Sequence, residues 1–119
     1  MKAIFIIGGL ILLQVAVHSA GVQIEQGTQS YFGSPCLPEL VSGVKSGNRS
    51  EVRHIVFDTP FVGEPKIFAA LSSIDNFLDR NLRIRTYAEN ITNTGFDLVL
   101  ETWWDTKLCG GTVSWMAIL

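Results

Sequence analysis

Alternation of polar and apolar side chains is the feature that most restricts how this chain can fold. It runs through residues 82–89, 96–103 and 112–119, with shorter candidates at 22–26, 52–57 and 66–72. A period of two residues is the signature of β-strands, whereas an amphipathic helix repeats about every 3.6 residues. Since no long segment follows the helical period, the sequence predicts an all-β fold.

Turn-forming residues separate these candidate strands. They occur at Gly33-Ser34-Pro35, Ser46-Gly47-Asn48, Gly63-Glu64-Pro65, Asn93-Thr94-Gly95 and Gly110-Gly111. Six short strands with frequent turns favour a six-stranded antiparallel β-sandwich. Residues 28–50 are expected to form a long connection with little strand, and residues 76–81 have room for one helical turn.

The amino terminus has the order of features found in a secretory signal peptide. Lys2 precedes an apolar run at 3–17, and small residues follow at 19–21. The run is shorter than the roughly 20 residues of a membrane-spanning helix, which is the alternative interpretation. We expect cleavage near Ala20, secretion to the extracellular space, no membrane insertion, and a single domain over residues 21–119.

The charge of the chain gives no sign of nucleic-acid or anionic-membrane binding. The formal net charge is −2, and loss of Lys2 with the signal peptide makes it −3. Proteins that bind nucleic acid carry a basic patch or stripe, and no such run of Lys and Arg occurs in this sequence. The expected partner is therefore neutral or is reached through specific contacts.

Both cysteines, Cys36 and Cys109, lie in the part expected to be exported. An even number in an oxidising compartment favours one intrachain disulfide, and bonds to other subunits are the alternative. A bridge that closes about 70 residues contributes about 4 kcal/mol in the chain-entropy model. Two sequons, which begin at Asn48 and Asn90, are candidate glycosylation sites.

Catalytic chemistry has few candidates in this sequence. His54 is the only histidine beyond the expected signal peptide, and it lies inside an expected strand, where surface or structural roles are commoner. The sequence shows no Gly-rich phosphate loop, nucleophile motif or metal-ligand spacing. It therefore predicts a protein without enzyme activity, cofactor or metal.

The adjacent tryptophans Trp103 and Trp104 are the most unusual local feature. Neighbouring residues on a strand face opposite sides, so at most one of them is expected in the core. An exposed tryptophan ring can stack on the apolar face of a sugar, and an arginine such as Arg83 or Arg85 supplies directional donors to hydroxyls. These residues indicate a saccharide site, and a solvated strand face is the alternative. Trp115 is expected to pack inside.

An ordered series of residues resembles the H-type lectin domain of snail agglutinins and slime-mould discoidins. The series covers residues 22–119 and contains, in order, Ile55-Val56-Phe57, Phe61, Pro65, Leu71, Ile74-Asp75, Asn81-Leu82-Arg83, Asn90-Ile91-Thr92, Gly95-Phe96, Thr102-Trp103, Asp105-Thr106 and Val113-Ser114-Trp115-Met116-Ala117. The resemblance implies a homotrimer that binds N-acetylgalactosamine or galactose without metal, in clefts between neighbouring subunits.

The resemblance also assigns roles to individual residues. Arg83 matches the sugar-contacting arginine of the family, and Trp103 matches the tryptophan of its cleft. Trp104 and Cys109 stand where the snail agglutinin has a contacting histidine and a contacting tyrosine. The hydrogen bond of that histidine to the sugar is therefore expected to be lost or to be replaced by stacking on Trp104. The neighbouring subunit would contribute the loop around residues 44–48.

The function implied by the resemblance is that of a multivalent lectin. Its expected partners are glycans with terminal N-acetylgalactosamine or galactose on glycoproteins or cell surfaces, and its expected roles are innate defence, egg protection or cell adhesion. The alternative is a related sandwich that has lost sugar binding and serves as a structural or protein-binding secreted subunit.

Overall fold

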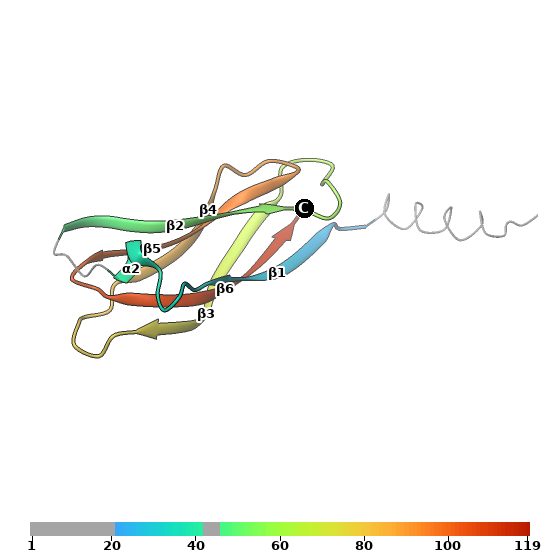
Figure 1. Cartoon of the computed structure of the whole chain (residues 1–119). Helices are drawn as coiled ribbons and strands as arrows, with labels where there is room; N and C mark the ends of the chain where they lie inside the picture. Colours follow the sequence, from blue (N-terminus) through green and yellow to red (C-terminus); the bar gives the residue numbers. More distant parts are fainter. Residues whose placement is uncertain (1–20, 42–45) are drawn as a thin grey trace, which may run out of the picture.

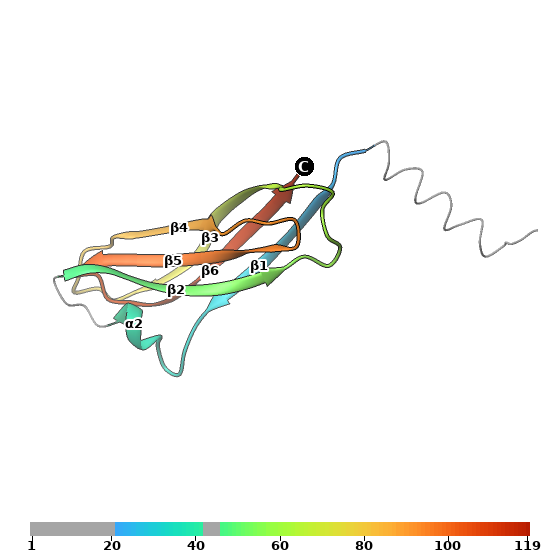
Figure 2. The ribbon, with the colours of Figure 1, turned by 90° about the horizontal axis from the view of Figure 1, so that it is seen from above.

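A computed structural model of the chain describes residues 21–41 and 46–119. Six strands form two antiparallel three-stranded sheets, in the orders β1-β6-β3 and β2-β5-β4 (Figures 1 and 2). The strands and the one short helix of this part are β1 (Ile24–Tyr31), α2 (Pro38–Val41), β2 (Ser46–Val56), β3 (Lys66–Asn76), β4 (Ile84–Glu89), β5 (Gly95–Trp104) and β6 (Leu108–Ile118). The predicted six-stranded antiparallel sandwich is confirmed. The expected signal peptide, residues 1–20, lies outside the described residues.

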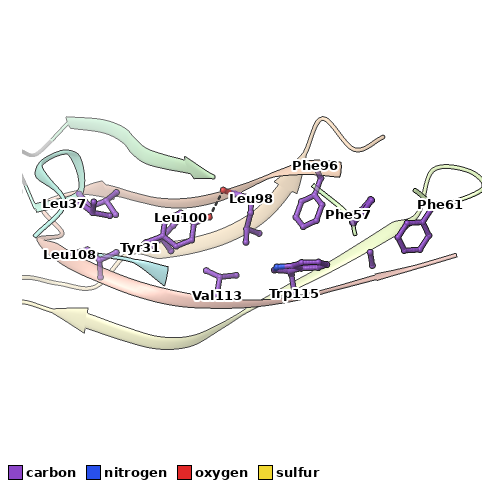
Figure 3. Close-up of a cluster of buried hydrophobic side chains, with 12 residues drawn as sticks. Tyr31, Leu37, Phe57, Phe61, Phe96, Leu98, Leu100, Leu108, Val113 and Trp115 are labelled. Atoms are coloured by element: carbon purple, nitrogen blue, oxygen red, sulfur yellow. Dashed lines mark hydrogen bonds between the residues drawn. The ribbon is translucent and has the colours of Figure 1, made fainter. Parts of the chain in front are cut away.

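Strands β5 and β6 lie at the centres of their sheets, and their alternation builds the core between the sheets (Figure 3). The inward side chains of β5 are Phe96, Leu98 and Leu100, and they face Val113 and Trp115 of β6. The core is aliphatic near the β5–β6 turn and aromatic toward the other end. There Phe96 packs edge-on against Trp115, with 5.2 Å between the ring centroids. Trp115 is buried, as the sequence predicts.

Tyr31, at the end of β1, links the two sheets across the core. Its hydroxyl donates a hydrogen bond of 2.6 Å to the carbonyl oxygen of Leu98 on β5. The guanidinium of Arg53 lies 5.0 Å from the centre of the Tyr31 ring. Burial of the phenol is the main cause that raises the pKa of Tyr31 from 10.0 to about 12, because the charged form would lose its hydration.

The connection expected at residues 28–50 is shorter than predicted. β1 continues to Tyr31, and β2 already begins at Ser46. The alternation test missed these parts because β1 and β2 are edge strands whose inward positions include Gly27, Gln29 and Arg49 rather than aliphatic residues. At Gly27 a Cβ atom would lie 2.7 Å from the indole of Trp115, so the ring occupies the space a larger residue would need.

A disulfide ties this connection to β6. Cys36 and Cys109 are bonded across a sequence separation of 73 residues, with their Cα atoms 4.5 Å apart. The amide of Leu37 donates a hydrogen bond of 3.1 Å to the carbonyl of Cys109, which places α2 against the start of β6. The disulfide has the intrachain pairing that the sequence favours.

The helical turn considered for residues 76–81 is wrong. β3 extends to Asn76, and a non-helical turn follows before β4. Asp75 lies at the exposed end of β3, and Asp79 lies in the turn. In the part of the chain that the structure describes, no helix has the length and apolar character needed to cross a membrane.

Candidate functional site

The turn between β5 and β6, at the left of Figure 1, carries the tryptophan pair. Trp103 is half-buried and points to the outer side of the β2-β5-β4 sheet, on the same side as Glu101. Trp104 has a φ of 61°, a left-handed conformation that ends the alternation of the strand. Its side chain is 46% exposed, so neither tryptophan belongs to the core.

Next to the β5–β6 turn, the register of the β2-β5-β4 sheet places residues of three neighbouring chain segments side by side. Trp104 pairs with Ser46 of β2, and Thr102 pairs with both Arg49 of β2 and Ile84 of β4. Trp103 therefore has Asn48 beside it on one neighbouring strand and Arg83 on the other. We call Asn48, Trp103 and Arg83 the end row. The arginine and tryptophan that the sequence singled out are brought together by this register.

Arg83 is held in place by the β5–β6 turn. Its guanidinium Nη1 donates to Asp105 Oδ1 at 2.7 Å, and the side chains of Arg83 and Asp105 are 34% and 12% exposed. Its backbone amide donates to the Thr106 hydroxyl at 2.8 Å, and that hydroxyl donates to the carbonyl of Asn81 at 2.8 Å. Arg83 thus enters β4 in a fixed position, with part of its guanidinium open to solvent.

Arg49 holds the same turn from inside the sandwich. Its buried guanidinium donates to three carbonyl oxygens, those of Trp104 at 2.7 Å, Thr106 at 3.1 Å and Leu40 at 3.4 Å. One charge therefore joins β2, the end of α2 and the turn that carries Trp104. Arg49 was not among the residues singled out from the sequence, although an arginine at an inward position of a strand is a signal for such an anchor.

A second ion pair lies in the next row of the sheet. Glu101 is only 4% exposed although it points to the outer face, and it accepts hydrogen bonds from Arg85 and from the Tyr87 hydroxyl, the latter at 2.9 Å. The hydrogen bond to Glu101 is the largest cause that raises the pKa of Tyr87 above its ordinary 10.0. The Arg85 guanidinium also stacks over Trp103, 5.4 Å from its ring centre.

Arg83 and Arg85 therefore have different roles. The sequence placed both on the polar side of one strand, with a saccharide site and a solvated face as the two interpretations. In the structure each is paired with its own carboxylate, Asp105 for Arg83 and Glu101 for Arg85. Arg85 neutralises a buried acid and supports the ring of Trp103, whereas Arg83 lies at the edge of the exposed turn. Neither carboxylate could be assigned to its arginine from the sequence, because the pairing depends on register and on the path of the turn.

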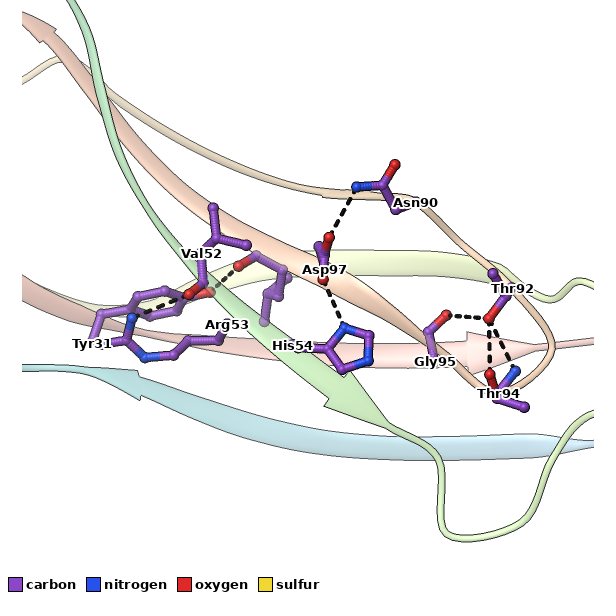
Figure 4. Close-up of polar contacts among 10 residues, drawn as sticks. Tyr31, Val52, Arg53, His54, Asn90, Thr92, Thr94, Gly95 and Asp97 are labelled. Atoms are coloured by element: carbon purple, nitrogen blue, oxygen red, sulfur yellow. Dashed lines mark hydrogen bonds and ion pairs between the residues drawn. The ribbon is translucent and has the colours of Figure 1, made fainter.

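The remaining residues singled out from the sequence lie apart from the end row. Cys109 is buried and bonded to Cys36, so it offers no hydroxyl of the kind that the family places there. Asn90 has a φ of 53° in the turn between β4 and β5, at the other end of the sheet. There its amide donates to Asp97 Oδ2 at 2.9 Å, and His54 Nδ1 lies 2.8 Å from Asp97 Oδ1 (Figure 4).

The Asp97 carboxylate is stabilised by both neighbours. Two hydrogen bonds lower the pKa of Asp97 below its ordinary 3.8. The bond from Asn90 is the larger cause, and the bond with His54 is the second. His54 is an exposed residue on the outer face of β2. The loop contribution expected from residues 44–48 is described only from Ser46 onward, since 42–45 lie outside the described residues.

The chemistry available at the end row is recognition. The half-buried indole of Trp103 offers a surface for stacking, and the guanidinium of Arg83, fixed by Asp105, offers directional N–H donors. The exposed indole of Trp104, the next residue along the chain, is a second candidate for stacking. Within residues 21–41 and 46–119, no group of three or more His, Cys, Asp or Glu side chains could hold a metal ion.

Comparison with known proteins places the chain in a family of non-enzymatic binding domains. A family model for the H-type lectin domain matches residues 52–118, and the chain belongs to this family. It is 36% identical over 103 residues to a Fuscovulum blasticum protein described as ATP synthase subunits region ORF 7, covering 83% of this chain and 85% of the other. Discoidin-2 of Dictyostelium discoideum is 31% identical over 74 residues, which cover 61% of this chain and 29% of discoidin-2.

Solved structures agree on the fold. Recombinant discoidin II of Dictyostelium discoideum superposes with a TM-score of 0.67 at 24% identity, over 83% of this chain and 37% of that chain. The tailspike protein gp49 of Pseudomonas phage LKA1 gives a TM-score of 0.53 at 13% identity, over 82% of this chain and 15% of that one. The chain thus spans little more than a third of discoidin II, and both likenesses concern the fold.

Proposed function

We propose that this chain is a secreted, multivalent lectin that binds glycans ending in N-acetylgalactosamine or galactose. Its targets would be glycoproteins or cell surfaces, in innate defence, egg protection or cell adhesion. Membership of the H-type lectin family supports carbohydrate binding as the general activity. The sugar, the secretion and the assembly are parts of the proposal.

The observation that carries the proposal is the position of Arg83. Its guanidinium is fixed by Asp105 at 2.7 Å, and the strand register places Arg83 beside Trp103 in the end row. The turn that holds Arg83 directly follows the exposed Trp104. This arrangement suits a galactose-type sugar, which has one apolar face for stacking and an axial hydroxyl for a directional hydrogen bond. The fixed geometry lowers the entropy lost when a sugar is bound.

An apolar row next to the ion pairs supports assembly. Val52, Val99 and Tyr87 lie side by side on the outer face of the β2-β5-β4 sheet, where Val52 is 46% exposed. A neighbouring subunit packed over this row would lie two residue rows from the end row along the same face of the sheet. We propose a homotrimer assembled through this face, in which three weak sites on one body bind a glycan-covered surface by effective concentration.

The test is binding of N-acetylgalactosamine to the Arg83→Ala variant, measured by calorimetry. Loss of a charge-assisted hydrogen bond costs about 1.5–3 kcal/mol, so affinity should fall about ten- to hundredfold. Arg83→Lys keeps the charge opposite Asp105 but loses the planar donors, and should also bind more weakly with its fold intact. Circular dichroism and the melting temperature show whether each variant is folded.

The matched control is Arg80→Ala. Arg80 is also paired with an aspartate, Asp79, at 2.9 Å, but this pair lies exposed in the turn after β3. Arg85→Ala is a poor control because it leaves the buried carboxylate of Glu101 without its guanidinium partner. If Arg83→Ala, Arg80→Ala and the unchanged chain bind the sugar equally well, the sugar site does not lie at the end of the sheet that carries Arg83. A folded chain that binds no sugar would favour the structural or protein-binding alternative.

A further inference from the structure

Asn48 occupies one end of the row that forms the candidate sugar site. It begins the sequon Asn48-Arg49-Ser50, and its side chain is exposed on β2. The register shifts between Ser46 and Arg49, so the bulged residues of β2 lie opposite Trp103. The sequon is therefore located beside the indole that the site uses.

The direction of the Asn48 side chain is set by its neighbour. Arg49 points into the sandwich, where its guanidinium holds the carbonyls of Trp104 and Thr106. Because successive residues of a strand face opposite sides, Asn48 faces outward, as Ser50 and Val52 do farther along β2. Asn48 and Trp103 thus share the outer face of the sheet, about 5 Å apart in strand spacing, and Arg83 lies about one strand farther on.

We propose that Asn48 carries an N-linked glycan that covers the end row and weakens binding of external sugars. This inference rests on the proposed function, since it concerns regulation of the same site. In the modification, Asn48 Nδ2 attacks C1 of the first sugar of a lipid-pyrophosphate-linked oligosaccharide. A C1–N bond forms, the C1–O bond to the pyrophosphate breaks, the lipid pyrophosphate leaves, and the amide loses one proton.

The glycan acts at this position because it is bulky and cannot enter the sandwich. N-linked glycans are large, hydrated surface groups, and Arg49 prevents Asn48 from turning inward. The first sugars must therefore lie over Trp103 or over the neighbouring residues of the outer face. A bulky group that blocks a binding site makes the binding free energy of the ligand less favourable.

Asn90 provides a control within the same chain. It begins the second sequon, but it lies in the β4–β5 turn, beside Asp97 of β5. Asp97 and Trp103 are six residues apart on β5, which at about 3.3 Å per residue separates the two sequons by roughly 20 Å. A glycan on Asn90 therefore leaves the end row uncovered.

The experiment compares the full chain made in animal cells with the same chain made in bacteria, which do not add this glycan. Asn48→Gln and Ser50→Ala each remove the first sequon, and Asn90→Gln removes the second. Mass spectrometry of the secreted protein locates the glycans, and calorimetry with N-acetylgalactosamine and with galactose measures the affinity of single sites. In the bacterial protein Ser50→Ala and Asn90→Gln should bind as the unchanged chain does, because neither residue belongs to the end row. Any change in bacterial Asn48→Gln measures the direct contribution of the Asn48 side chain, and the effect of the glycan is the further difference between the animal-cell and bacterial proteins.

In the animal-cell protein we expect a glycan on Asn48. Its affinity for the sugar should be lower than that of the bacterial protein by a factor of about ten or more. Asn48→Gln and Ser50→Ala should both restore the affinity, whereas Asn90→Gln should not. An unmodified Asn48, or equal affinity with and without its glycan, would overturn the inference. Failure of the bacterial protein to bind either sugar would instead overturn the proposed function.

Discussion

The outer face of the β2-β5-β4 sheet carries ion pairs and a buried acid, whereas the middle of the outer face of the β1-β6-β3 sheet, the uncharged face, carries neither. On the first face, Arg85, Glu101 and Tyr87 form one network and His54 pairs with Asp97. The outward residues of the second face include Ile24, Gln26, Thr28, Ser30, Lys66, Phe68, Ala70, Asp75, Thr112, Ser114, Met116 and Ile118, of which Lys66 and Asp75, near the two ends of β3, are charged. Among the described residues, no ion pair involves β1, β3 or β6.

The difference shows that the two faces meet different requirements. The β1-β6-β3 face mixes short side chains such as Ala70 with Phe68 and Met116, and its polar contacts are those of neutral hydroxyls, as between Ser114 and Ser72. The β2-β5-β4 face buries a carboxylate, and such a group is tolerated only when donors surround it. Its side chains are therefore fixed in position, which is the property that a recognition site beside them requires.

The largest effect is expected from Arg85→Ala on the charged face. The variant leaves the buried Glu101 carboxylate with fewer donors, and breaking such a pair costs about 3 kcal/mol. Gln26→Ala on the uncharged face should change the free energy of unfolding by no more than about 0.5 kcal/mol. Urea denaturation measures both, and similar values for the two variants would abolish the distinction between the faces.

A sharper test compares two buried threonines near the site. The Thr106 hydroxyl donates to the Asn81 carbonyl and accepts from the Arg83 amide, whereas the Thr102 hydroxyl has no hydrogen-bond partner among the described residues. Thr106→Val should cost about 1–3 kcal/mol because two backbone groups lose their partner. Thr102→Val should be neutral or stabilising.

The same pair of variants separates positioning from stability. Thr106→Val should also weaken sugar binding, because Arg83 is no longer held against the turn, and Thr106→Ser should restore it. Thr102→Val should leave binding unchanged. Equal binding by the two valine variants would show that the turn does not set the position of Arg83.

A smaller effect is expected when charge is moved to the uncharged face. Gln26 and Met116 are directly opposed across β1 and β6, so Gln26→Glu combined with Met116→Lys creates a cross-strand ion pair. Such pairs contribute about 0.2–1 kcal/mol at an exposed position. A double-mutant cycle measures the coupling, and a value as large as the loss in Arg85→Ala would show that the two faces respond to charge alike.

The smallest effect concerns the pKa of Asp97. Its carboxyl has a lowered pKa, so the stability from its hydrogen bonds is present above the ordinary value of 3.8 and is lost as the pH falls through the folded-state pKa. Asn90→Ala should raise this pKa more than His54→Ala does, since the bond from Asn90 is the larger cause. Carbon-detected NMR titration of the carboxyl gives both values, and the reverse order would contradict this account.

The strands that the sequence predicted best are those with apolar inward positions. Residues 82–89, 96–103 and 112–119 correspond to β4, β5 and β6, because one side of each strand must be buried between the sheets. The outer edge strand β1 and the first half of β2 were not predicted over their full lengths. Their inward positions hold Gly27, Gln29 and Arg49, whose roles depend on Trp115 and on backbone carbonyls elsewhere in the chain.

The candidate site was predicted in part. Arg83, Trp103 and Trp104 could be named because tryptophan beside a turn and arginine on a polar strand face are unusual, and because the family resemblance matches Arg83 and Trp103. Asp105 and Thr106 were quoted in that resemblance without a role. Their function appears when the turn folds back and brings them to Arg83, 22 and 23 residues away in sequence.

The sequence by itself determined the all-β class, the number of strands and which side of the central strands faces inward, because alternation is a local property of the chain. Only the tertiary structure decided the partners of the polar groups: Asp105 for Arg83, Glu101 for Arg85, and three carbonyls for Arg49. The physical reason is that apolar burial needs only a side of the sheet, whereas a hydrogen bond or an ion pair needs one atom at a defined distance and direction.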